Sequence, residues 1–303
     1  MSKRLVILGD SHTSFFEHIY HGGFHHGHGY GFKPPQRTSK FEHKKCYDNL
    51  DIQICKSQGA TAYGILNPES QSRSNIIFSN FLKNKIIEDS QKPSVKYYAD
   101  IEANPPDYVC FFLGEIDCRV ASYLNPKKYN NFKDLLKKSA ENLYKFCCDE
   151  VFNKVVDPNR VVFLSPHLSK SIDPRENKTV SLESLTERTY FFNDLLSKFS
   201  DVINISINDK IFNKEKNTVK DEFLNGSDTI HLSGINIYNN KISTFWAEDL
   251  CNLPNCDPNE LHKLKFHEGK NLDGGKGRWA KSNEKGKHSS AWSNWSCQNE
   301  RAR

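Results

Sequence analysis

Short apolar runs recur along the chain and are separated by longer segments with apolar residues at helical spacing. Most of these runs are continuous rather than alternating, which is typical of strands covered on both faces. Five runs predict strands, and they are Arg4–Leu8, Asp51–Cys55, Tyr108–Leu113, Arg160–Leu164 and Val202–Ile205.

The segments between these runs predict helices. Asn125-Pro126 has the N-cap and first-turn residues of one helix. Ser184 and Glu187 form a capping-box pattern at the start of another. Two further helices are expected over about residues 70–88 and 234–250. Strand–helix alternation predicts an α/β protein, a three-layer α/β/α sandwich around a parallel five-stranded sheet.

The composition fits a folded protein without membrane spans. Hydrophobic residues make up 37% of the 303 residues, which is enough for a sizeable core. No stretch approaches the roughly 20 apolar residues of a membrane-spanning helix, and the N-terminal run is shorter than the roughly 7–15 of a signal peptide. The nine cysteines show no C-x-x-C spacing, and several lie in apolar runs, as reduced core thiols do. We expect a cytoplasmic protein with no membrane partner.

The formal net charge of +5 belongs to the C-terminal segment. From Lys263 to Arg303 there are ten basic and four acidic residues, which leaves 32 basic and 33 acidic residues elsewhere, a net of −1. The segment is rich in Gly, Ser, Asn and Lys, so we expect it to be disordered. Nucleobase stacking is the weaker interpretation of its three tryptophans, and nucleic acid is not an expected partner. The tryptophans are Trp279, Trp292 and Trp295. We expect a domain over residues 1–255 and a basic tail over residues 256–303.

Small and polar residues follow each predicted strand. Ligands of parallel sheets bind beyond the carboxyl ends of the strands, so these segments are candidates for a site. They are Gly9-Asp10-Ser11-His12, "SQGATAYG" with Gly59, "GEIDCR" from Gly114 to Arg119, "SPHLS" with Ser165 and His167, and "SDTIHLSG" with Asp228 and His231. Ordinary loop composition explains the glycines, but not a Ser, an Asp and a His at separate strand ends.

Four of these segments, in this order, resemble the sequence blocks of SGNH, or GDSL-type, hydrolases. "GDSH" contains Ser11, "GAT" contains Gly59, "GEID" stands where the family has glycine-x-asparagine-aspartate, and "DTIH" contains Asp228 and His231. The resemblance covers about residues 4–250 and implies a flavodoxin-like fold with no cofactor and no metal. "GEIDCR" looks like a recurring variant of the third block.

The resemblance implies an acyl-transfer site. Ser11 is then the nucleophile, His231 the base and Asp228 the group that orients the base. Two residues three apart on one turn can face each other, which supports this pair; alternatively, Asp228 caps the following helix and His231 lies on the surface. The implied oxyanion donors are the backbone N–H groups of Ser11 and Gly59.

The third block departs from the family at Ile116, which replaces the asparagine donor. Losing one such donor typically costs on the order of 10²–10³ in rate. Arg119 could replace it as a cationic donor or bind an anionic substrate group; equally, it could pair with Glu115 or Asp117 and hold the loop. Together with His12, these three charged residues are candidates for substrate binding or oxyanion support.

Histidines are concentrated near the N-terminus. Seven of the twelve lie between His12 and His43, and five lie between His18 and His28. Imidazoles suit Zn²⁺ and Ni²⁺, but the segment is glycine-rich and contains no carboxylate. A mobile loop over the site is therefore the favoured interpretation, and we expect no metal site.

The function expected from these residues is that of a serine esterase or O-acyltransferase. The substrate would be a small-molecule or saccharide ester, most readily the O-acetyl ester of a carbohydrate, with water or a sugar hydroxyl as acceptor. The alternative, favoured by Ile116, is a catalytically weak carbohydrate-binding protein that lacks a full oxyanion hole. Nothing in the sequence predicts an oligomer.

Overall fold

The computed structural model describes residues 3–13, 16, 50–83, 87–89, 92–97, 105–121, 131–168, 182–225, 228–232 and 241–255. All of them fall within the first of the two units into which the chain divides, residues 1–269 and 270–303. The expected tail, residues 256–303, and the histidine-rich segment between His18 and His28 lie outside the described residues. The domain boundary after residue 255 therefore stays a prediction.

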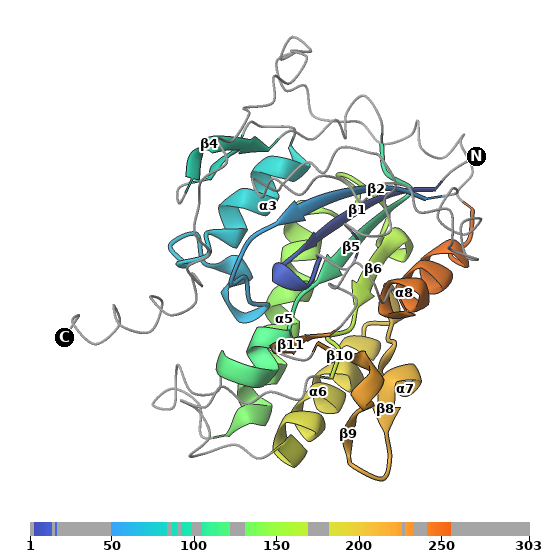
Figure 1. Ribbon diagram of the computed structural model, residues 1–303. Coiled ribbons are helices and arrows are strands. Elements are labelled where there is room, and N and C mark those ends of the chain that lie inside the picture. The colour runs from blue at the N-terminus through green and yellow to red at the C-terminus, as the bar shows by residue number, and fades with distance from the viewer. Residues whose placement is uncertain are drawn as a thin grey trace, which may run out of the picture. The chain divides into compact units, whose positions relative to one another are not determined.

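A five-stranded parallel sheet forms the centre of the described fold (Figure 1). Its strands are β1 (Lys3–Gly9), β2 (Leu50–Lys56), β5 (Tyr108–Phe112), β6 (Val161–Leu164) and β7 (Ile203–Ile205). They lie in the order β2-β1-β5-β6-β7, and every neighbouring pair is parallel. This is the flavodoxin-like order, in which the direction of strand addition reverses between β1 and β5. All five predicted strands are confirmed, with ends that differ by at most one residue.

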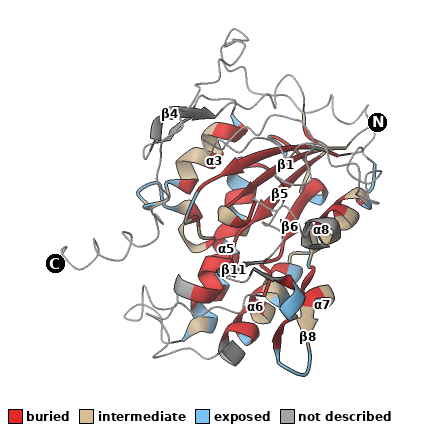
Figure 2. Cartoon of the chain, viewed as in Figure 1, coloured by how far each residue is buried: buried red, intermediate tan, exposed pale blue. Residues whose placement is uncertain are grey.

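Helices cover both faces of the sheet. Val6 and Leu8 of β1 belong to one buried cluster, whereas Leu5 and Ile7 belong to another, as the alternation of side chains along a strand requires. The first cluster includes residues of α3 (Ser74–Leu82), α5 (Phe132–Glu150) and α6 (Leu182–Ser197). The second includes residues of α7 (Asn208–Ile211) and α8 (Lys241–Cys251). The predicted three-layer sandwich is therefore confirmed, and β5, β6 and most of β1 are buried between the layers (Figure 2).

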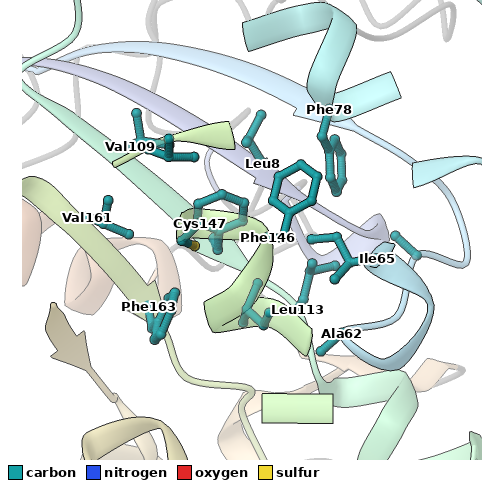
Figure 3. Close-up of a cluster of buried hydrophobic side chains, with 14 of the residues drawn as sticks. Leu8, Ala62, Ile65, Phe78, Val109, Leu113, Phe146, Cys147, Val161 and Phe163 are labelled. Atoms are coloured by element: carbon teal, nitrogen blue, oxygen red, sulfur yellow. The ribbon is translucent and has the colours of Figure 1, made fainter. Parts of the chain in front are cut away.

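The segment that follows β2 is packed into the first cluster. Ala62 and Ile65 are both fully buried there, in the same cluster as Phe78 of α3 and Phe146 of α5 (Figure 3). Ile65 lies in η2 (Tyr63–Leu66), a short 3-10 helix. Burial of these two side chains attaches the loop after β2 to the core.

Two predicted helix starts are wrong. The α5 helix begins at Phe132, because the side chain of Asn131 accepts a hydrogen bond from the Asp134 backbone N–H at 3.0 Å and caps it. Asn125 therefore does not cap this helix, and Asn125-Pro126 lies outside the described residues. The α6 helix already includes Leu182, so Ser184 lies inside the helix rather than at its N-cap.

The predicted helix over residues 70–88 is shorter than expected. The α3 helix ends at Leu82, and Glu88 lies in β3 (Ile87–Asp89), which pairs antiparallel with β4 (Lys92–Tyr97). Two further small hairpins follow β7 and were not predicted, because each contains at least one strand of only two residues, which is too short to show a periodicity. They are β8 (Phe212–Asn213) with β9 (Thr218–Val219), and β10 (Leu224–Asn225) with β11 (Asp228–Leu232).

The described cysteines agree with the expectation of reduced thiols. Six are described, all of them free, and four of these are buried. The four buried thiols are Cys55, Cys110, Cys118 and Cys147. Within the described residues, no helix combines the length and the apolar character needed to cross a membrane.

Candidate functional site

Ser11 lies directly beyond the carboxyl end of β1, at the point where the strand order reverses. It begins η1 (Ser11–Thr13), a single 3-10 turn, and is half-buried. The hydroxyl of Thr13 donates to the Asp10 carbonyl at 2.8 Å and closes the turn. Glycine is required at position 9, because an added Cβ would lie 2.5 Å from the Phe112 carbonyl oxygen and 2.6 Å from Cγ2 of Thr13. The first block therefore presents a serine where ligands of such sheets bind.

Asp10 holds His12 in one orientation. Its Oδ1 accepts from the His12 backbone N–H at 2.8 Å and from Nδ1 of the same residue at 2.9 Å. Both side chains are buried. Burial lowers the pKa of His12, but the charge and hydrogen bond of Asp10, together with the Glu115 carboxylate, outweigh it and raise that pKa above its usual 6.5. The charged imidazolium is therefore favoured next to Ser11.

Glu115 connects the third block to the first. Its Oε1 lies 2.6 Å from Nε of Arg119, and its Oε2 lies 3.9 Å from Nε2 of His12. Although burial alone would raise the pKa of Glu115, Arg119 and His12 lower it to about 2. Asp10, His12, Glu115 and Arg119 thus alternate in charge across the carboxyl ends of β1 and β5. The opposite charges around them favour the ionised states of His12 and Glu115.

The backbone of the third block is shaped by a glycine. Gly114 has φ +115°, and a Cβ there would lie 2.2 Å from Cε1 of Phe192. Ile116 is buried and apolar, so its side chain supplies no hydrogen-bond donor. A π-helical turn, η3 (Asp117–Ala121), follows; such turns are frequent at functional sites.

Arg119 is buried and engaged with Glu115. Besides the Nε contact, its Nη2 lies 3.4 Å from Oε2 of Glu115. These contacts favour the interpretation in which Arg119 holds the loop over the one in which it replaces the asparagine donor. Asp117, the other candidate partner of Arg119, accepts hydrogen bonds from Ala62, Tyr63 and Ser139.

Gly59 lies in a turn whose start is attached to the first block. The Ser57 backbone N–H donates to the Gly9 carbonyl at 2.8 Å, and the Ala60 N–H returns to the Ser57 carbonyl at 3.1 Å. Gly59 has φ +72° in this turn, a conformation that favours glycine. The second block therefore lies next to the first, as the resemblance implies.

His167, which follows β6, joins the same group although it was not among the predicted site residues. Its ring centroid lies 4.7 Å from that of His12. Its Nδ1 lies 2.8 Å from the Leu168 carbonyl oxygen, so Nδ1 carries the proton. The loop is held by Asn208, which donates to the Pro166 carbonyl and accepts from the Leu168 N–H, both at 2.9 Å. No role was predicted for Asp10 either. The only feature of the sequence that pointed to Asp10 and His167 was their position after a predicted strand.

Asp228 and His231 lie in a strand rather than on a helical turn. They belong to β11 (Asp228–Leu232), which pairs antiparallel with β10. The expectation that the two share one turn is therefore wrong, because an argument from three-residue spacing does not apply to extended backbone. The structure describes only the backbone of these residues, so their pairing with Ser11 stays a prediction.

The described residues form no cluster suited to a metal ion. Among them, no group of three or more His, Cys, Asp and Glu side chains is placed to hold a metal ion. The histidine-rich segment between His18 and His28 lies outside this set, so its interpretation as a mobile loop stays a prediction.

Comparisons with known proteins show similarity of the backbone fold only. No family model matches the chain, and no curated protein sequence matches it. A lipase/acylhydrolase from Enterococcus faecalis is 12% identical, with 88% of this chain and 100% of that chain covered and a TM-score of 0.43. An aryl esterase from M. smegmatis is 14% identical, with 84% and 100% covered and a TM-score of 0.43. A catalytic mutant of an acetylxylan esterase from Geobacillus stearothermophilus is 12% identical, with 88% and 97% covered and a TM-score of 0.40. These similarities assign no role to any residue of this chain.

Proposed function

We propose that the chain is a serine ester hydrolase or O-acyltransferase of the SGNH type, with Ser11 as nucleophile. The observation that carries the proposal is the position of Ser11. It opens the turn beyond β1, at the reversal of strand order, and the second and third blocks lie against the same strand ends. A serine placed there, with glycine-containing turns beside it, is suited to attack a carbonyl carbon.

The proposed reaction proceeds through an acyl-enzyme. Oγ of Ser11 attacks the ester carbonyl carbon while His231 accepts the hydroxyl proton, which forms a tetrahedral oxyanion. Collapse of this intermediate expels the alcohol, which takes the proton from His231. Water, or a sugar hydroxyl in a transferase, then attacks the acyl carbon and gives its proton to His231, which returns that proton to Oγ of Ser11 as the acyl–oxygen bond to Ser11 breaks. Asp228 is proposed to orient His231.

Stabilisation of the oxyanion is assigned to backbone groups. The N–H groups of Ser11 and Gly59 are the proposed donors, since the turns that carry them are joined by the Ser57–Gly9 hydrogen bond. Preorganised donors of this kind supply a large share of the rate in acyl transfer. Ile116 supplies no donor, and Arg119 is bound to Glu115, so we assign Arg119 to holding the third block.

The alternating charges around His12 support this site without taking part in bond exchange. Asp10 and Glu115 are on either side of the His12 imidazole, and Arg119 balances Glu115. The four groups together carry no net charge when all are ionised. We infer that they fix the first and third blocks relative to each other.

The proposed substrate is the O-acetyl ester of a carbohydrate. The support is the resemblance of "GDSH" and "GEIDCR" to SGNH proteins associated with surface-polysaccharide modification. Acetate release from an O-acetylated oligosaccharide tests the substrate, and transfer of the acetyl group to an added sugar acceptor separates a transferase from a hydrolase.

A carbohydrate-binding protein of weak activity is the second candidate function. The observation that favours it is the buried apolar side chain of Ile116 at the position of the family's asparagine. If this candidate is correct, Ser11→Ala should bind the saccharide as tightly as the wild type does. The wild type should then turn over esters no faster than Ser11→Ala.

The test of the proposed function is hydrolysis of p-nitrophenyl acetate by the wild type, Ser11→Ala, His231→Ala and the double variant. Each single substitution should remove nearly all turnover, and the double variant should be no worse, because residues that act as a unit give non-additive losses. Wild-type turnover in His231→Ala would refute the proposed base.

A further inference from the structure

Asp117 is fully buried, and both of its carboxylate oxygens are bonded to the protein itself. Oδ2 accepts from the Ala62 backbone N–H at 2.8 Å, and Oδ1 accepts from the Tyr63 backbone N–H at 2.8 Å. Oδ1 also accepts from the Ser139 hydroxyl of α5, again at 2.8 Å. One side chain thus joins the third block, the segment after β2 and the α5 helix. Two adjacent backbone N–H groups on one carboxylate fix both the position and the direction of the segment that carries them.

This segment is the one that carries Gly59. Its start is attached to the first block, since the Ser57 N–H donates to the Gly9 carbonyl at 2.8 Å. Its end is attached to the third block through Asp117. A further contact comes from Asn142 of α5, whose Nδ2 donates to the Tyr63 carbonyl at 2.7 Å. Gly59 lies between the two attachments, only three residues before Ala62.

We propose that Asp117 is a positioning residue, which sets the backbone N–H of Gly59 for the oxyanion by holding Ala62 and Tyr63. The proposal rests on the proposed function, because it requires Gly59 to act as an oxyanion donor. Asp117 itself does not touch the substrate in this account. Oxyanion donors act only when their N–H groups lie within hydrogen-bond distance of the developing charge, so the loop must be fixed before the substrate arrives.

Asp117→Asn is the first variant that tests this role. The amide keeps the size of the side chain but replaces one acceptor oxygen with an NH₂ group. One of the two backbone N–H groups therefore loses its partner, and the loop moves or loosens. Displacements of about 1 Å in an active site can cost on the order of 10²-fold in rate. The expected result is a fall in kcat of about 10- to 100-fold, with KM changed by less than about twofold.

Asp117→Glu is the second variant, and it decides the question if Asp117→Asn does not fold. It keeps the charge and both acceptor oxygens on a side chain one methylene longer. The loop is displaced rather than released, so kcat should again fall. A kcat equal to that of the wild type in either folded variant would overturn the proposal.

Two control variants separate positioning from general destabilisation. Ser139→Ala removes the third hydrogen bond of Asp117 but leaves both backbone N–H bonds, so kcat should stay near the wild-type value while Tm falls. Asp107→Ala removes the carboxylate that accepts from the Arg4 backbone N–H at 2.7 Å, at the amino end of the sheet; it too should lower Tm and spare kcat.

Hydrogen–deuterium exchange provides a measurement that does not depend on turnover. The amides of Ala62 and Tyr63 should exchange faster in Asp117→Asn than in the wild type, and at the wild-type rate in Ser139→Ala. The two proposals can fail separately. A wild type without Ser11-dependent hydrolysis would refute the proposed function and this role with it, whereas an active wild type with an equally active Asp117→Asn would refute the role of Asp117 alone.

Discussion

Nε of Arg119 lies 2.6 Å from Oε1 of Glu115, and each of these side chains is only 5% exposed. An ion pair of the same i,i+4 spacing occurs in α5 between Lys145 and Asp149, at 2.9 Å, where the side chains are 63% and 48% exposed. Removing one charge of a buried pair is destabilising, because the other charge then stays buried without an opposite charge beside it. The buried pair therefore contributes to the stability of the third block, whereas the exposed pair contributes little.

Arg119→Met should lower the free energy of unfolding by about 3–5 kcal/mol, the usual cost of leaving a buried charge unpaired. Lys145→Met is the matched control, and it should leave that free energy almost unchanged, because exposed ion pairs contribute little. Urea denaturation of the three proteins measures both values. Adding Glu115→Gln to Arg119→Met should recover part of the loss, since the buried Glu115 charge that has lost Arg119 is then removed. Equal losses in the two single variants would contradict the structural role of the pair.

The charge of His12 should make stability depend on pH. The folded-state pKa of His12 is raised above 6.5 by Asp10 and Glu115, against the effect of burial. The stabilisation from this group is therefore complete below about pH 6.5 and is lost as the pH rises through the folded value. The difference in unfolding free energy between the wild type and His12→Gln should be largest near pH 6 and shrink in alkaline buffer. A difference that stays constant from about pH 6 to pH 9 would show that His12 is not charged in the fold.

Gly114→Ala should be strongly destabilising. The backbone is at φ +115°, and the new Cβ would lie 2.2 Å from Cε1 of Phe192. Backbone strain and overpacking each cost about 1–3 kcal/mol, so a loss of about 3 kcal/mol is expected in denaturant unfolding. Adding Phe192→Leu should relieve the overpacking but not the strain. If Gly114→Ala has the same urea midpoint of unfolding as the wild type, the third block does not pack closely against α6.

The strands were predictable because their signal is strong and local. A parallel sheet buried on both faces requires continuous apolar runs, and each of the five runs became a strand of the central sheet. Helix starts were less predictable because several polar residues compete for each cap. Asn131 caps α5 with Asp134 three residues on, a signal as strong as the one at Asn125.

The candidate site was predictable as a set of blocks but not as a set of contacts. Strand order alone brings the segments after β1, β2 and β5 together, so Ser11, Gly59 and Glu115 were expected to be neighbours. The hydrogen bonds that Asp117 accepts from Ala62 and Tyr63 join positions more than fifty residues apart, and no local pattern in the sequence predicts them. The Asp228–His231 turn was predicted from a three-residue spacing that suits a helical turn, but the backbone there is extended.

The most direct test of the central claim, that Ser11 is an activated nucleophile, is to treat the protein with a fluorophosphonate and locate the adduct by peptide mass spectrometry. We expect one adduct per chain, on the peptide that contains Ser11, with slower labelling in His231→Ala because the base no longer takes the hydroxyl proton. Ser11→Ala should carry no adduct. If Ser11 stays unlabelled in a folded protein that still hydrolyses p-nitrophenyl acetate, Ser11 is not the nucleophile.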